Sequence, residues 1–193
     1  MLYRIAGCIF IFFFKLFYFY KVIGRKNVPS GGFLICGNHT GLSDPIFIAV
    51  ALGLFAKKPV RFMAKAELFE NKLFGAVLRG LGAFPVKRGA ADIGAIKEAL
   101  KILNSGGRLL VFPEGTRNST EGAKAGAGML ALRSDCDVVP VYVSPGRKLF
   151  HRVYIVFGQP YRPALPDAKP VSEDYHRAAD EILRRVYTLE NNR

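Results

Sequence analysis

The chain has 193 residues, of which 50% are hydrophobic, and its mean hydropathy is +0.18. It is long enough for one domain with a sizeable core, too short for two full catalytic domains, and too apolar to be disordered or collagen-like. Its 28 Lys and Arg against 15 Asp and Glu give a formal net charge of +13, which predicts an anionic partner: nucleic acid, phospholipid headgroups or an acidic protein. Residues 1–88 carry most of this excess, with 13 Lys and Arg against three acids.

The chain begins with an apolar segment, IAGCIFIFFFKLFYFY at residues 5–20, whose only charge is Lys15. As an α-helix it would be about 24 Å long, shorter than the roughly 30 Å hydrocarbon core of a bilayer. Aromatic residues with a snorkelling lysine are typical of a segment at headgroup level, so residues 1–23 are predicted to be a helical membrane anchor that precedes a domain over 24–193.

Three other interpretations of this segment stay open. One is a short single span across the membrane. A second is a cleaved signal peptide, although the small-residue cleavage site that such a peptide needs is missing. The third is a buried helix of the core, which is disfavoured because apolar residues surround the helix instead of forming one stripe.

After Gly24, short apolar runs alternate with helix-length periodic stretches. This alternation predicts a single α/β domain with a central, mostly parallel or mixed sheet flanked by helices. The predicted strands are 33–37, 60–64, 84–86, 108–112, 138–144 and 153–157. The predicted helices are 45–55, 67–80, 92–104, 124–133 and 172–189.

The three cysteines, Cys8, Cys36 and Cys136, have neither CxxC nor CxxH spacing. They are therefore expected to be free thiols in a reducing compartment. The sequence also contains no metal-ligand cluster and no glycine-rich nucleotide loop, so no metal and no cofactor are expected.

The first chemical motif is NHTGLSD at residues 38–44, directly after a predicted strand. On a helix, His39 and Asp44 would point about 140° apart, so they can meet only if the chain turns between them. Gly41 permits such a turn, and a carboxylate on one imidazole nitrogen would leave the other as a general base toward a hydroxyl. The alternative is that Asp44 only caps the helix that follows.

Further candidate residues also follow predicted strands. In FPEGTR, Gly115 lets the backbone approach a ligand, Thr116 offers a hydroxyl and Arg117 offers a planar fork suited to phosphate. Lys65 and Arg88 come at the ends of two other runs. Each could be an ordinary turn or surface charge, but the carboxyl ends of strands converge on the binding crevice in open α/β sheets.

Four blocks together resemble the glycerolipid acyltransferases, most closely the bacterial 1-acyl-sn-glycerol-3-phosphate acyltransferases. NHTGLSD is similar to their His-x4-Asp block, GAFPVKR to their second block, FPEGTRN to their acceptor-binding block, and VVPVYV, with Pro140, to their fourth. All four stand in family order between residues 38 and 143. One departure is Lys124, which stands alone where relatives often carry a longer basic run.

The resemblance implies an enzyme of phospholipid biosynthesis that uses an acyl thioester of coenzyme A or acyl carrier protein and needs no cofactor. His39, oriented by Asp44, would take the proton from the sn-2 hydroxyl of lysophosphatidate, giving phosphatidate. The implied acceptor-binding residues are Lys65, Arg88, Glu114, Gly115, Thr116 and Arg117. The oxyanion donor is not evident from the sequence, and backbone N–H groups after His39 are one candidate.

Two alternatives remain at this point. The same blocks serve other acceptors, such as glycerol-3-phosphate, other lysophospholipids or an ornithine-type lipid. A non-catalytic basic module that binds membranes or nucleic acid is the remote alternative, and no nucleic-acid-binding motif supports it. The expected partners are therefore an anionic phospholipid membrane, lysophosphatidate and the thioester donor, with the protein at the cytoplasmic face of the cell membrane.

Overall fold

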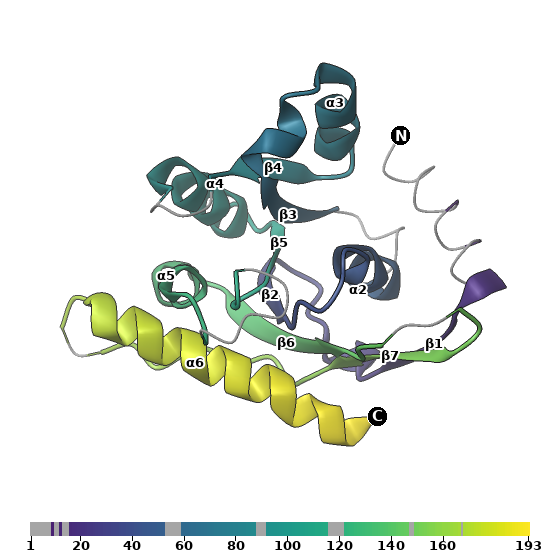
Figure 1. The fold of residues 1–193 in the computed structure, drawn as a ribbon. Helices are drawn as coiled ribbons and strands as arrows, with labels where there is room; N and C mark the ends of the chain where they lie inside the picture. Colours follow the sequence, from purple (N-terminus) through teal and green to yellow (C-terminus); the bar gives the residue numbers. More distant parts are fainter. Residues whose placement is uncertain are drawn as a thin grey trace.

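The chain forms an α/β domain around one mixed sheet. The computed structural model describes residues 9, 12, 16–52, 59–87, 92–115, 122–146, 149–166 and 168–193. Within them, seven strands form a sheet in the order β1-β7-β6-β2-β5-β3-β4 (Figure 1). The strands are β1 (Phe19–Ile23), β2 (Phe33–Gly37), β3 (Val60–Lys65), β4 (Ala83–Val86), β5 (Arg108–Val111), β6 (Asp137–Val143) and β7 (Arg152–Phe157).

Helices cover both faces of this sheet (Figure 1). They are α2 (Asp44–Leu52), α3 (Lys72–Gly80), α4 (Ile93–Asn104), α5 (Ala125–Arg133) and α6 (Ser172–Thr188), with short 3₁₀ helices η1 (Arg25–Asn27), η2 (Ala66–Phe69) and η3 (Leu189–Asn192). Helix α2 packs on one face, whereas α4, α5 and α6 pack on the other. Helix α3 lies beyond the edge strand β4, at the top of Figure 1.

Strand β2 is the centre of the core, and all five of its residues are buried. Because side chains alternate along a strand, Phe33 and Ile35 pack toward α2, while Leu34 and Cys36 pack toward α4, α5 and α6. A strand buried on both faces needs a continuous run of apolar residues, and the FLIC sequence of β2 is such a run.

The strand directions place five strand ends at one edge of the sheet. Strands β6, β2, β5, β3 and β4 run parallel, so all of them end at this edge, which we call the carboxyl edge. Strand β7 is antiparallel to β6, and β1 is parallel to β7. The connection from β6 to β7 and the start of β1 therefore lie at the carboxyl edge as well.

The predicted strands and helices agree with these elements to within a few residues, with one clear exception in the helices. The predicted helix 67–80 is interrupted: η2 ends at Phe69 and α3 begins at Lys72. The Asn71 side chain accepts a hydrogen bond from the backbone N–H of Phe74 at 3.0 Å, which caps α3 and gives it a new start.

A second difference concerns the segment predicted to be a helical anchor. Its last part, Phe19–Ile23, is the edge strand β1, hydrogen-bonded to β7. The residues FYKVI include aromatic and β-branched side chains that suit a strand. Most of residues 1–15 lie outside the described part, and none of the described helices is long and apolar enough to cross a membrane.

Candidate active site

Buried polar side chains gather at the carboxyl edge. Five polar or charged side chains are buried in the described part of the chain: Asn38, His39, Asp44, Glu114 and Ser144. All five follow the ends of β2, β5 or β6. Since a buried polar group is costly unless it is hydrogen-bonded, each of these side chains needs a hydrogen-bond partner, and these partners define the site.

Asn38 attaches the start of the loop between β2 and α2, which we call the His39 loop, to the neighbouring strand β6. Its Nδ2 donates to the backbone carbonyl of Val143 at 2.9 Å, and its Oδ1 accepts from the backbone N–H of Val143 at 2.8 Å. The side chain thus continues the pairing of β2 with β6 one step beyond the end of β2. In the sequence, Asn38 stands out only as the first residue of the NHTGLSD motif, and nothing there predicts this role.

His39 and Asp44 are brought together by a turn, as their spacing requires. His39 Nδ1 lies 3.0 Å from Asp44 Oδ2, and Asp44 is fully buried at the first residue of α2. A carboxylate partner makes Nδ1 the protonated ring nitrogen and leaves Nε2 as a proton acceptor. The positive end of the α2 dipole also favours a carboxylate at this position.

The backbone of the turn is held by the same carboxylate. Asp44 Oδ2 accepts the N–H groups of Thr40 and Gly41, each at 2.8 Å. These are the first two backbone N–H groups after His39, which the sequence analysis considered as an oxyanion hole. Because they point at Asp44, they serve to shape the turn and are not presented to a substrate.

Phe112 supports the imidazole from the side. The rings of His39 and Phe112 are stacked, with centroids 4.1 Å apart and planes 17° from parallel. Only 10% of the His39 side chain is exposed, so the ring has little freedom to rotate away from Asp44. The strand predicted over 108–112 ends at Phe112, whereas β5 ends one residue earlier, at Val111.

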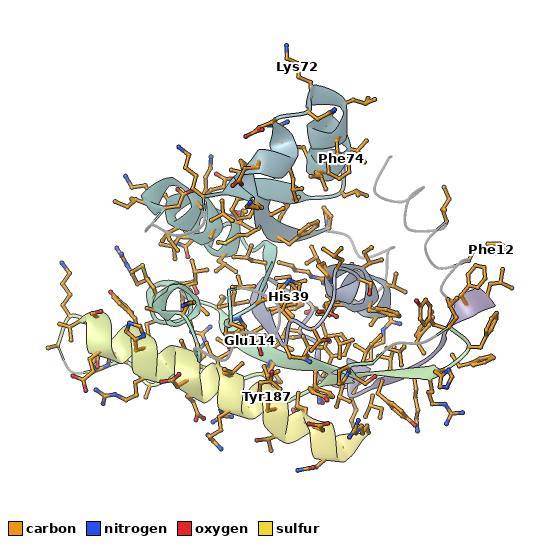
Figure 2. The ribbon with its side chains drawn as sticks, viewed as in Figure 1. Phe12, His39, Lys72, Phe74, Glu114 and Tyr187 are labelled. Carbon is orange, nitrogen blue, oxygen red and sulfur yellow. The ribbon has the colours of Figure 1, made fainter. Side chains whose placement is uncertain are left out.

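Glu114 joins the His39 loop to helix α6. Its Oε2 accepts the backbone N–H of His39 at 3.1 Å, and its Oε1 accepts the hydroxyl of Tyr187 in α6 at 2.5 Å. Figure 2 shows Glu114 between His39 and Tyr187. Burial, together with the hydrogen bond to Glu114, raises the pKa of Tyr187, so its hydroxyl stays protonated as a donor. Nothing in a single sequence pairs residues 73 positions apart, and Tyr187 was missed.

The turn that carries Glu114 depends on a glycine. The backbone N–H of Gly115 donates to the carbonyl of Phe112 at 2.9 Å, and Gly115 has a φ of 71°. This left-handed conformation costs glycine little and strains most other residues. The predicted ligands that follow in the motif, Thr116 and Arg117, lie outside the described residues, as does Arg88.

Lys65, another predicted acceptor-binding residue, ends β3 at the surface. Its Nζ lies 3.0 Å from Glu67 Oε1, and the side chains of both residues are about half exposed, at 49% and 53%. An exposed ion pair of this kind is weak and can open to receive another anion.

The described residues offer little for other kinds of chemistry. Burial raises the pKa of the Cys36 thiol, and of the Cys136 thiol as well, so neither is a ready thiolate nucleophile. Among the residues that the structure describes, no three His, Cys, Asp or Glu side chains are grouped as metal ligands would be. The arrangement around His39 is therefore suited to accepting a proton at Nε2 from a hydroxyl in a water-poor site.

Comparisons with known proteins show what the chain is similar to. The family model described as Acyltransferase matches residues 20–144. The chain is 33% identical over 178 residues to a 1-acyl-sn-glycerol-3-phosphate acyltransferase of Bacillus subtilis, covering 89% of this chain and 88% of that protein. It is 36% identical over 164 residues to a protein of the same name from Streptococcus pneumoniae, covering 81% of this chain and 58% of that protein.

Two further relatives are informative. A lyso-ornithine lipid O-acyltransferase of Pseudomonas aeruginosa is 32% identical over 130 residues, covering 65% of this chain and 48% of that protein. A crystal structure of the 1-acyl-sn-glycerophosphate acyltransferase from Thermotoga maritima matches the fold with a TM-score of 0.64 and 25% identity, covering 90% of this chain and 72% of that chain.

The link between Glu114 and Tyr187 gives a test of the site's architecture. Tyr187→Phe removes the hydroxyl that donates to a buried carboxylate, so the free energy of unfolding should fall by about 1 kcal/mol. Urea unfolding followed by circular dichroism measures the change. The control is Tyr175→Phe, which lies about 18 Å earlier along the same helix. Equal changes in the two variants would show that the hydrogen bond to Glu114 contributes nothing.

Proposed function

Since the chain belongs to the acyltransferase family, we propose that it transfers an acyl group from an acyl thioester to the sn-2 hydroxyl of 1-acyl-sn-glycerol-3-phosphate. The product is phosphatidate, and the reaction is a step of phospholipid biosynthesis. The observation that carries the proposal is the buried hydrogen bond between His39 and Asp44 in the family's His-x4-Asp block. The names of the Bacillus and Streptococcus relatives support the choice of acceptor.

In the proposed mechanism His39 is the general base. Its Nε2 takes the proton of the acceptor hydroxyl while the hydroxyl oxygen attacks the thioester carbonyl carbon, forming the new C–O bond. The tetrahedral intermediate then collapses, the C–S bond breaks, and the sulfur leaves with the proton that Nε2 carried. A thioester is already activated, so the reaction needs no covalent acyl-enzyme.

Asp44 has two tasks in this scheme. It holds Nδ1 so that Nε2 faces the substrate, and it stabilises the positive charge that the imidazole gains when it takes the proton. Glu114 and Tyr187 act one step further away, because they hold the His39 backbone and not its ring. We therefore regard them as positioning residues.

The acceptor phosphate is held by cations in this proposal. Arg117 and Arg88 supply guanidinium forks that match phosphate geometry, and Lys65 adds a point charge at the end of β3. Glu114, Gly115 and Thr116 shape the same end of the site. The supporting observation is that Lys65 and Glu114 follow two neighbouring strands, β3 and β5, at the carboxyl edge.

The proposal also covers the acyl donor and the place in the cell where the protein works. The donor is a thioester of coenzyme A or acyl carrier protein, and no cofactor takes part. The protein works at the cytoplasmic face of the cell membrane. Of the anchor expected at residues 1–23, the part that precedes β1, residues 1–18, binds among anionic phospholipids. The apolar, aromatic-rich composition of this segment and the positive charge around it support the assignment.

A second acceptor class has its own support. The Pseudomonas relative is named as an acyltransferase for lyso-ornithine lipid, and it is 32% identical to this chain. The candidate alternative is therefore an ornithine-type lipid with a free hydroxyl. Assaying both acceptors side by side separates the two, because an ornithine lipid has no phosphate for Arg117 to bind.

The first test of the mechanism is His39→Ala. Loss of the general base should lower kcat by about 10²- to 10⁴-fold in an assay of phosphatidate formation from detergent-dispersed lysophosphatidate. His176→Ala, at an exposed position on α6, is the matched control and should retain full activity. Activity of His39→Ala within a few-fold of the parent would overturn the mechanism.

The second test concerns the phosphate. If Arg117 binds the acceptor equally in the ground and transition states, Arg117→Ala should raise the acceptor KM about tenfold or more and leave kcat little changed. Steady-state kinetics with the donor at saturation measure both constants. Arg177→Ala, on the exposed side of α6, is the control. An unchanged KM for Arg117→Ala would remove this residue from the phosphate site.

A further inference from the structure

Exposed apolar side chains are distributed unevenly over the molecule. In the described part of the chain, fifteen large apolar side chains are exposed, and only two, Leu165 and Val171, lie in the connection between β7 and α6. That connection follows the end of β7 at the edge opposite to the active site. Scattered exposed apolar residues are ordinary, but a set gathered on one side marks an interaction surface.

Three separate connections carry exposed apolar side chains at the carboxyl edge. Leu42 lies in the loop after β2, Leu68, Leu73 and Phe74 follow β3, and Leu149 and Phe150 lie between β6 and β7. We call these six residues the apolar rim. Leu42 is 77% exposed and Leu73 is 80% exposed, so neither has a place in the core.

The apolar rim lies at the same edge of the sheet as His39 and includes residues far apart in the sequence. In Figure 2, His39 lies near the middle of the view, with Phe74 above it and Phe12 to its right. Phe150 is joined to the chain ahead of β1: its backbone N–H donates to the carbonyl of Phe17 at 2.7 Å, and the two rings lie 6.1 Å apart. The rim is thus continuous with the segment that leads from the N-terminus.

Charges beside the rim favour an anionic surface. Helix α3 carries Lys72 and Arg79 and no acid, and β7 begins at the exposed Arg152. Helix η2 and its C-cap carry two acids, Glu67, which pairs with Lys65, and Glu70. Apolar side chains flanked by Lys and Arg are the combination that binds at the headgroup level of an anionic bilayer.

From these observations we infer that the apolar rim is a docking surface for an anionic phospholipid bilayer, formed by the loop after β2, η2, the start of α3 and the β6–β7 connection. Leu73, Phe74, Leu149 and Phe150 insert among the headgroups, so the carboxyl edge of the sheet faces the lipid. A lipid acceptor could then reach His39 without leaving the membrane. This last point rests on the proposed function, but the docking itself does not.

The sequence offers a direct way to test the docking, because the chain contains no Trp. Leu73→Trp and Leu149→Trp each place a single fluorescent reporter in the rim, and Leu165→Trp places one at the opposite edge, where Leu165 is 68% exposed. The reporters are read with vesicles of phosphatidylcholine and phosphatidylglycerol that contain brominated lipid, which quenches Trp on contact.

Emission from positions 73 and 149 should shift to shorter wavelength and be quenched several-fold more than emission from position 165. Equal quenching at all three positions would overturn the inference, because the rim would then be no closer to lipid than the opposite edge. A blue shift at position 73 that rises with protein concentration and needs no vesicles would also overturn it, since a second copy of the chain would then cover the rim.

Activity gives an independent measurement. With lysophosphatidate embedded in vesicles, Leu73→Ser combined with Leu149→Ser should lower the rate by at least about tenfold, since two apolar side chains no longer enter the bilayer. With detergent-dispersed lysophosphatidate the same variant should match the parent, and Leu165→Ser should match it in both assays. Equal losses in both assays would contradict a role in docking.

The two hypotheses fail in different ways. If the parent forms no phosphatidate from any lysophosphatidate preparation while positions 73 and 149 are quenched, the docking stands and the proposed acceptor is wrong. If phosphatidate forms but positions 73 and 149 are quenched no more than position 165, the proposed function stands and the docking surface is wrong.

Discussion

Hydrogen bonding of the buried polar side chains at the carboxyl edge is the constraint on which this site depends. Strand β2 is buried on both faces, and Asn38, His39 and Asp44, which follow it, are buried as well. Asn38 is satisfied by the backbone of Val143, His39 by Asp44, and Glu114 by Tyr187 and the His39 backbone. Each pair is costly to break, because the partner left behind would be buried without a hydrogen bond.

These hydrogen bonds explain how the His39 loop, between β2 and α2, can hold the His39 imidazole in one orientation. The His39 ring is fixed on its edge by Asp44 and on its face by Phe112, and its backbone is fixed by Glu114. Two parts of the fold supply these contacts: the start of α2, with Asp44, and the segment directly after β5, with Phe112 and Glu114. A base held in this way does not have to be ordered again at each turnover, and this saves part of the entropy cost of reaction.

The central sheet and the His39–Asp44 pair could be predicted because they depend on local patterns. Apolar runs of strand length mark β2, β5 and β6, and a glycine between His39 and Asp44 permits the turn that joins them. Other features depend on contacts between distant residues. Tyr187 reaches Glu114 only because α6 crosses the sheet. Strand β1 pairs with β7, more than 100 residues later in the chain, and without that contact the FYKVI sequence is predicted as the end of an apolar helix. The break before α3 was missed for a different reason: Asn71 can cap a helix or lie within one, and the apolar pattern continues on both sides of it.

Buried polar side chains and exposed apolar side chains lie at the same edge of the sheet, because its parallel strands end there together. Strands that end together bring their polar groups together, which creates a buried, hydrogen-bonded site around His39. The connections that leave these strands must also start at this edge, and here they expose apolar side chains such as Leu42 and Leu73. The hydrogen-bonded polar side chains are buried, whereas the apolar rim is exposed to solvent. The two are only three residues apart in the chain at His39 and Leu42. An acceptor with a polar headgroup and an apolar chain can contact both the polar site and the apolar rim at this edge. A water-soluble acceptor has no apolar chain that would contact the rim.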